Sequence, residues 1–199
     1  RVTFDGARAA GVELRQGART FVVRAAREVV LAAGAIQSPQ LLELSGIGDA
    51  AVLAAHGIPV HRHLPGVGEN LRDHLQARLM YEARGIETLN DILPSTWKKA
   101  KMALRYALFR DGLMATAGAT AHAYARIDPA SPQPDVKLQL HHLSSPDERN
   151  PTRIVLDDFP GFSIGVVHQQ PASRGSVHLA SADPLAPPRI RANFLSADE

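Results

Sequence analysis

The feature that most constrains this chain is the run of residues 34–48, which contains the signals for one helix and for both of its ends. An apolar stretch over 28–33 precedes it, a pattern typical of a buried parallel strand that enters a turn. Ser38 is a favourable N-cap, and Pro39 suits the first helical position, where a missing N–H costs nothing. Gly46 can take the left-handed conformation that ends a helix. The run therefore predicts a strand, a turn and a short helix.

Length and composition exclude several classes of protein. The chain has 199 residues, 45% of them hydrophobic, which is enough to build one large or two small domains. Its formal charge of +2 is spread along the sequence, whereas nucleic-acid binding needs clustered Lys and Arg, so no nucleic-acid partner is expected. The absence of cysteine excludes disulfides and thiolate metal sites. No apolar run approaches the roughly 18 residues of a transmembrane helix, so none is expected.

The first part of the chain, residues 1–75, has the pattern of an α/β domain. Short strands are predicted over 10–14 and 20–25, with a hairpin loop between them. A second small helix is predicted after residue 48, with Asp49 as its N-cap and Gly57 as its stop.

From residue 76 onward, longer strands alternate with proline-rich loops, which is typical of an antiparallel α+β domain. The predicted strands are 76–81, 121–126, 136–143, 162–169 and 176–180. One helix is predicted over 96–109. The residues on its apolar side are Trp97, Ala100, Leu104, Ala107 and Leu108.

Residues 34–48 resemble, position for position, the second signature of the glucose-methanol-choline (GMC) oxidoreductases, flavoenzymes that oxidise alcohols. Stretches that resemble other parts of these enzymes are 4–13, 64–74, 112–119 and 173–179. The resemblance implies a fold with two parts. Residues 1–75 would be part of a Rossmann-like α/β FAD-binding domain, and residues 76–199 part of an α+β substrate-binding domain with an antiparallel sheet.

The same resemblance implies the chemistry and the cofactor contacts. FAD would accept a hydride at N5 from an alcohol, which becomes an aldehyde, with the electron acceptor left open. Ala33 and Gly34 would pass close to the adenosine half of FAD, and Asn70 would hold backbone groups near the flavin. Glycine suits such a place because a side chain would block the approach of the backbone to the ligand. The nearest resemblance is to members that oxidise choline or aliphatic alcohols, and another alcohol or a sugar remains an alternative.

Gln139 is the predicted substrate-binding residue. Alternation along its strand places Lys137, Gln139 and His141 on one face. The resemblance puts Gln139 at a cavity-lining position where the family has a histidine. A glutamine amide can hydrogen-bond a hydroxyl but does not accept a proton at neutral pH. The alternative is that Gln139 is only a half-buried strand residue.

No catalytic residue is assigned. The resemblance implies a glycine loop for the FAD pyrophosphate and a catalytic histidine near the C-terminus, and neither motif occurs in these residues. The chain is therefore expected to be an internal piece of an enzyme, inactive when isolated. A non-catalytic binding module is the second hypothesis. The expected location is the cytoplasm or the periphery of a membrane.

A histidine-based metal protein is the third hypothesis, because the chain has nine histidines. Its tightest groups are His61 with His63 and His141 with His142. Neither has the helical spacing or the nearby carboxylate typical of a zinc site, so no metal is expected.

Overall fold

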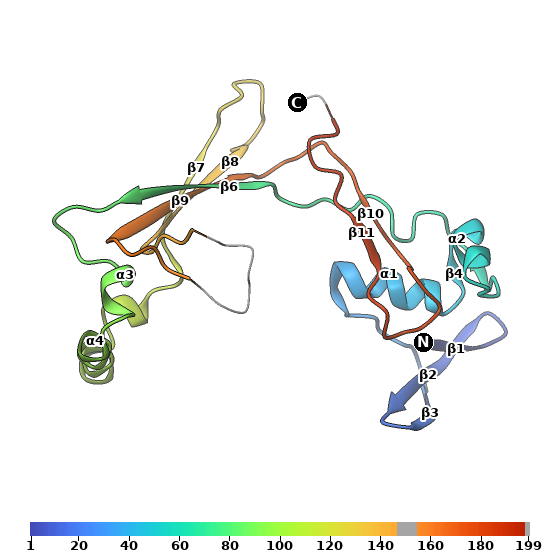
Figure 1. The fold of residues 1–199 in the computed structure, drawn as a ribbon. Helices are drawn as coiled ribbons and strands as arrows, with labels where there is room; N and C mark the ends of the chain where they lie inside the picture. The colour runs from blue at the N-terminus through green and yellow to red at the C-terminus, as the bar shows by residue number, and fades with distance from the viewer. Residues whose placement is uncertain (147–154, 198–199) are drawn as a thin grey trace. The chain divides into compact units, whose positions relative to one another are not determined.

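The computed structural model of the chain describes residues 1–146 and 155–197 and divides them into two compact units (Figure 1). Unit 1 consists of Arg1–Asp73 and Pro171–Glu199, and unit 2 of His74–Gln170. The end of the chain therefore packs with its beginning, although the sequence groups it with the residues that follow position 76.

Backbone hydrogen bonds explain this return of the chain to unit 1. The amide of Leu71 donates to the carbonyl of Gly175 at 2.9 Å, and the amide of Gly175 donates to the carbonyl of Leu71 at 2.8 Å. A Cβ at position 175 would overlap the carbonyl oxygen of Arg191 and lie 2.7 Å from that of Ala192, so glycine at this position allows residues 191 and 192 to approach closely. The boundary predicted after residue 75 relied only on local composition. Local composition does not report a pairing between residues that lie so far apart in the sequence.

The predicted strands at the start of unit 1 are confirmed. An antiparallel sheet in the order β1-β2-β3 consists of β1 (Val2–Asp5), β2 (Arg8–Gln16) and β3 (Arg19–Arg24). Gly6 and Gly17 close its two turns with φ of 56° and 59°, a conformation that glycine adopts at little cost.

The strand predicted over residues 28–33 is wrong. No part of this segment is a strand, and the side chain of Val30 is 76% exposed. A parallel strand depends on hydrogen bonds to neighbouring strands, and the sheets of the described residues contain none that pairs with it. The apolar pattern alone does not supply such a neighbour.

The helix after this segment exists but begins earlier than predicted. Helix α1 (Gly34–Leu44) has Ala33 at its N-cap, so Ser38 and Pro39 lie inside it. A proline within a helix removes one i→i−4 hydrogen bond but has a φ that a helix accepts, so it does not have to mark the start. At the other end, Gly46 ends the helix with φ of 81°, as predicted.

The second predicted helix is confirmed as α2 (Ala50–Ala55). The Asp49 carboxylate accepts hydrogen bonds from the amides of Ala51 at 2.8 Å and Val52 at 3.3 Å, and Gly57 follows the helix with φ of 68°. Short strand pairs complete unit 1: β4 (Ile47–Gly48) with β5 (Arg62–His63), which is parallel, and β10 (Ser176–His178) with β11 (Arg189–Arg191), which is antiparallel.

Unit 2 contains a four-stranded antiparallel sheet in the order β6-β9-β8-β7, as its alternating pattern predicts (Figure 1). Its strands are β6 (Gln76–Glu82), β7 (Ala119–Ala125), β8 (Val136–His141) and β9 (Gly161–His168). Its helices are α3 (Leu89–Ile92), the 3-10 helix η1 (Leu113–Ala115) and α4 (Thr96–Phe109), whose bounds agree with the prediction. In the part of the chain that the structure describes, no helix is long and apolar enough to cross a bilayer.

Candidate functional site

A pocket of about 340 Å³ lies in unit 1 between α1 and the segment that contains Asn70. Its residues from α1 include Ala35 and Ser38, and those opposite run from Val67 to Arg72. Asn70, one of the predicted cofactor residues, lines this pocket, and the other two, Ala33 and Gly34, directly precede Ala35 in the chain. Residues predicted from two separate motifs therefore lie at or next to one pocket.

The backbone around this pocket has unusual conformations. Gly34 has φ of 77°, and a Cβ added there would meet no other atom within 4 Å. Asn70 has φ of 60°, which is uncommon for a residue with a side chain, although asparagine tolerates it better than most. The start of α1 thus leaves open space beside its backbone.

One wall of the pocket is held by a close backbone crossing at Gly68. The carbonyl of Gly68 accepts a hydrogen bond from the amide of Val177 at 2.7 Å. With φ of 83°, a Cβ at position 68 would overlap the carbonyl oxygen of Val177 and lie 2.8 Å from Nδ1 of His178. Only glycine allows the segment to approach β10 this closely.

A half-buried histidine joins three segments of unit 1. His178 on β10 contacts Glu43 Oε1 on α1 through Nδ1 at 2.7 Å, and Glu69 Oε1 through Nε2 at 2.8 Å. The side chain of Glu43 has no exposed surface, and its Oε2 accepts a hydrogen bond from the amide of Leu179 at 2.8 Å. The ring can donate to both carboxylates only as an imidazolium.

The surroundings of His178 favour that charged form. Burial lowers the pKa of His178, but the hydrogen bonds to Glu43 and Glu69 outweigh burial, so that its pKa is raised. Sequence reasoning missed this cluster, because its members come from positions 43, 69 and 178. The single available signal was a charged residue, Glu43, between the leucines of α1.

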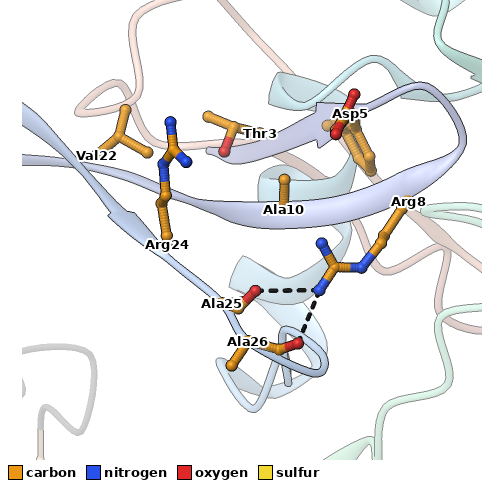
Figure 2. Close-up of a pocket in the computed structure, with 9 residues that line it drawn as sticks. Thr3, Asp5, Arg8, Ala10, Val22, Arg24, Ala25 and Ala26 are labelled. Carbon is orange, nitrogen blue, oxygen red and sulfur yellow. Dashed lines mark hydrogen bonds between the residues drawn. The ribbon is translucent and has the colours of Figure 1, made fainter.

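A larger hollow of about 670 Å³ lies on the three-stranded sheet (Figure 2). Arg8 points towards the loop after β3 and donates hydrogen bonds to the carbonyls of Ala25 at 3.2 Å and Ala26 at 2.8 Å. Arg24 also lines this hollow. None of the predicted cofactor residues does, so the candidate site is the smaller pocket.

Gln139, the predicted substrate contact, lies on β8 in unit 2 and is half-buried. Its cross-strand neighbours are His122 on β7 and Gly165 on β9. Within residues 1–146 and 155–197, the side-chain amide of Gln139 forms no hydrogen bond, so the structure leaves this side-chain group available to a ligand.

His61 and His63, one of the two histidine groups of the metal hypothesis, have structural contacts. The ring of His61 stacks on Phe4 with centroids 3.9 Å apart, and His63 Nδ1 accepts a hydrogen bond from the amide of Ala50 at 3.1 Å. Across the described residues, no three or more His, Asp or Glu side chains gather as a metal site.

Comparison with known proteins finds a family that part of this chain resembles. Residues 1–76 match the family described as GMC oxidoreductase. The oxygen-dependent choline dehydrogenase of Citrobacter koseri is 38% identical over 200 residues, a match that covers 100% of this chain and 35% of that protein. The enzyme of the same name from Sinorhizobium medicae is 38% identical over 204 residues, with 100% and 35% covered. The chain thus spans about a third of the length of these curated relatives.

The fold of the chain is also similar to solved structures. A structure of formate oxidase from Aspergillus oryzae, which concerns FAD modification, has a TM-score of 0.83 and 26% identity, and the match covers 96% of this chain and 37% of that one. Pyridoxine 4-oxidase from Mesorbium loti has a TM-score of 0.72 and 26% identity, with 98% and 34% covered.

Proposed function

We propose that this chain forms part of a GMC oxidoreductase, an FAD-dependent enzyme that oxidises the CH–OH group of an alcohol by hydride transfer to flavin. Choline or an aliphatic alcohol is the proposed substrate class, because the similar sequences are named choline dehydrogenases. In this proposal unit 1, which holds residues 1–73 and the returning residues 171–199, contributes to a Rossmann-like FAD-binding domain, and unit 2 contributes to the substrate-binding domain. The isolated chain would be inactive.

The observation that carries the proposal is the pocket of unit 1, whose lining comes in large part from the family-matched residues 1–76. The residues there fit a dinucleotide. Gly34 leaves its backbone accessible, and Asn70 exposes an amide that can donate and accept hydrogen bonds. When bound, FAD would supply the hydride chemistry, while Ala33, Gly34 and Asn70 would hold and orient it.

The cofactor part of the proposal is tested by a Gly34→Ala substitution in the flavoenzyme that contains these residues. Gly34 and Gly57 both have positive φ, 77° and 68°, and an added Cβ meets nothing within 4 Å at either position. The two alanine variants therefore carry the same backbone strain, but only position 34 adjoins the pocket. We expect Gly34→Ala to weaken FAD retention about tenfold, equal to about 1.4 kcal/mol.

The measurement is flavin absorbance per mole of protein after dialysis, with circular dichroism to show that both variants are folded. Gly57→Ala should retain FAD at the wild-type level. Equal loss of flavin in the two variants would mean that Gly34 has no special contact with the cofactor.

The substrate part of the proposal rests on Gln139. If its free amide hydrogen-bonds the substrate oxygen as charge develops, Gln139→Leu should lower kcat/KM by about ten- to a hundredfold, or about 1.5–3 kcal/mol. Lys137→Met, on the same face and two residues earlier, should change kcat/KM much less. Steady-state kinetics with flavin-saturated enzyme would measure both. An unchanged kcat/KM for Gln139→Leu would remove this residue from the substrate site.

A further inference from the structure

The contact between His178 and Glu69 lies beside the cofactor pocket. His178 Nε2 on β10 is 2.8 Å from Glu69 Oε1, and Glu69 directly precedes Asn70, the predicted cofactor residue. Both Glu69 and Asn70 line the pocket of about 340 Å³ beside α1, whereas His178 does not. A histidine behind the pocket therefore contacts a residue of its wall.

The position of Asn70 depends on the residues on either side of it. In the part of the chain that the structure describes, the Asn70 side chain forms no hydrogen bond, and its φ of 60° is uncommon for a residue with a side chain. On one side, Leu71 pairs with Gly175 through the backbone. On the other side, Glu69 is held by His178. Loss of the His178 contact would thus release one of the two neighbours of Asn70.

The protonation of His178 decides whether this contact forms. The ring can donate to Glu43 and Glu69 together only when both of its nitrogens carry protons. Glu43 has no exposed surface, and its second oxygen accepts a hydrogen bond from the amide of Leu179, so this carboxylate is fixed. The Glu69 side chain is 49% exposed and can turn into water. A neutral ring should therefore keep its contact with Glu43 and lose that with Glu69.

Basic groups lie on the remaining sides of His178. Its cross-strand neighbour Arg189 and the nearby Arg191, both on β11, line a hollow of about 190 Å³ with it, and His56 lines the same hollow. Both arginines are exposed, so solvent and salt screen their charges. Burial lowers the pKa of His178, but the hydrogen bonds to the two carboxylates outweigh burial, so that the pKa is raised.

We propose that His178 is a positioning residue for the cofactor. Its doubly protonated ring links Glu69 to Glu43 on α1, and the linked segment holds Asn70 in the geometry that retains FAD. This role rests on the proposed function, because it concerns the pocket assigned there to FAD. When the ring loses a proton at higher pH, the segment around Asn70 is released and FAD is retained less tightly.

The test measures FAD binding by the flavoenzyme that contains these residues, from about pH 5.5 to about pH 8.5, on both sides of the ordinary histidine pKa of about 6.5. Because the pKa of His178 is raised in the folded protein, its ring stays protonated in the lower part of this range. Titration of the apoenzyme, followed by the quenching of flavin fluorescence, gives the dissociation constant of FAD. We expect this constant to rise about fivefold towards the upper end, the equivalent of about 1 kcal/mol for a partly exposed ion pair.

Substitutions of histidine separate this proton from other groups that titrate. His178→Arg keeps a cation whose donors can reach both carboxylates, so its affinity for FAD should stay at the low-pH wild-type level throughout. His178→Gln is neutral at every pH and should stay at the high-pH wild-type level. His56→Gln removes a second half-buried histidine from the same hollow and should follow the wild-type profile.

Glu69→Gln repeats the test without a change at position 178, and circular dichroism shows that each variant is folded. Its affinity for FAD should vary less with pH than that of the wild type. Equal pH profiles for the wild type and either His178→Arg or Glu69→Gln, or wild-type affinity of His178→Gln at low pH, would overturn the role of His178. If Gly34→Ala still weakened FAD retention, the FAD pocket itself would stand. A wild-type enzyme that binds no FAD at any pH would overturn the proposed function and this role with it.

Discussion

A Gly68→Ala protein is expected to lose about 2–5 kcal/mol of unfolding free energy in unit 1. The left-handed φ of 83° costs an L-residue about 1–2 kcal/mol. The added methyl group would also overlap the Val177 carbonyl and crowd the His178 ring, and overpacking of this kind costs about 1–3 kcal/mol. Denaturant unfolding monitored by circular dichroism would measure the loss.

Gly66→Ala is the matched control, because it lies two residues away and its Cβ would meet nothing within 4 Å. This variant should be within about 0.5 kcal/mol of the wild type. If Gly68→Ala were as stable as the wild type, residues 67–72 could move away from β10. The close approach of Gly68 to β10 would then not be required for folding.

Glu43→Leu should destabilise unit 1 by about 3–5 kcal/mol, although leucine has a similar volume and is apolar. Removal of one partner from a buried ion pair leaves the other less compensated, and here His178 would keep only the half-exposed carboxylate of Glu69. The amide of Leu179 would also lose its acceptor, Glu43 Oε2. Chemical denaturation at a pH below about 6.5, where His178 is charged in both the folded and the unfolded state, would show the largest effect.

Glu69→Gln is the control for the exposed half of the same cluster. The Glu69 side chain is 49% exposed, and an ion pair at the surface contributes at most about 1 kcal/mol. A loss at Glu69 as large as that at Glu43 would contradict the assignment of the buried carboxylate as the main partner.

The pH dependence follows from the direction of the pKa shift. The folded-state pKa of His178 is raised, so its stabilising contribution is fully present below the unfolded value of about 6.5 and is lost as pH rises through the folded value. Wild-type stability should thus decline across that range, and the decline should be smaller in Glu43→Leu. The same decline in both proteins would exclude His178 as its source.

Local signals in the sequence were sufficient for much of the fold. The cap at Asp49, the glycine stops at Gly46 and Gly57, and the helix over 96–109 depend on neighbouring residues, and all appear in the structure. Pro39 misplaced the start of α1, because a proline is compatible with the helix interior at the loss of one hydrogen bond.

Long-range pairing explains what local patterns missed. The segment 28–33 has the composition of a strand, but strand formation also needs a neighbour, which composition does not report. The motif that contains Asn70 was predicted by family resemblance, while its meeting with α1 in one pocket depends on contacts with β10. Glu43 looked like an ordinary helix residue, since its partner His178 is distant in sequence.

The pairing of Leu71 with Gly175 has a consequence for how such a chain can diversify. The stretch that forms unit 2 leaves unit 1 and re-enters it at neighbouring points of the backbone. Unit 2 is thus an inserted guest domain, and unit 1 is its host. A guest domain whose two ends are adjacent can become longer or shorter, or be exchanged, without displacing the helices and strands of the host. The pocket beside α1 belongs wholly to the host, so a lineage can remodel the guest and keep that pocket unchanged.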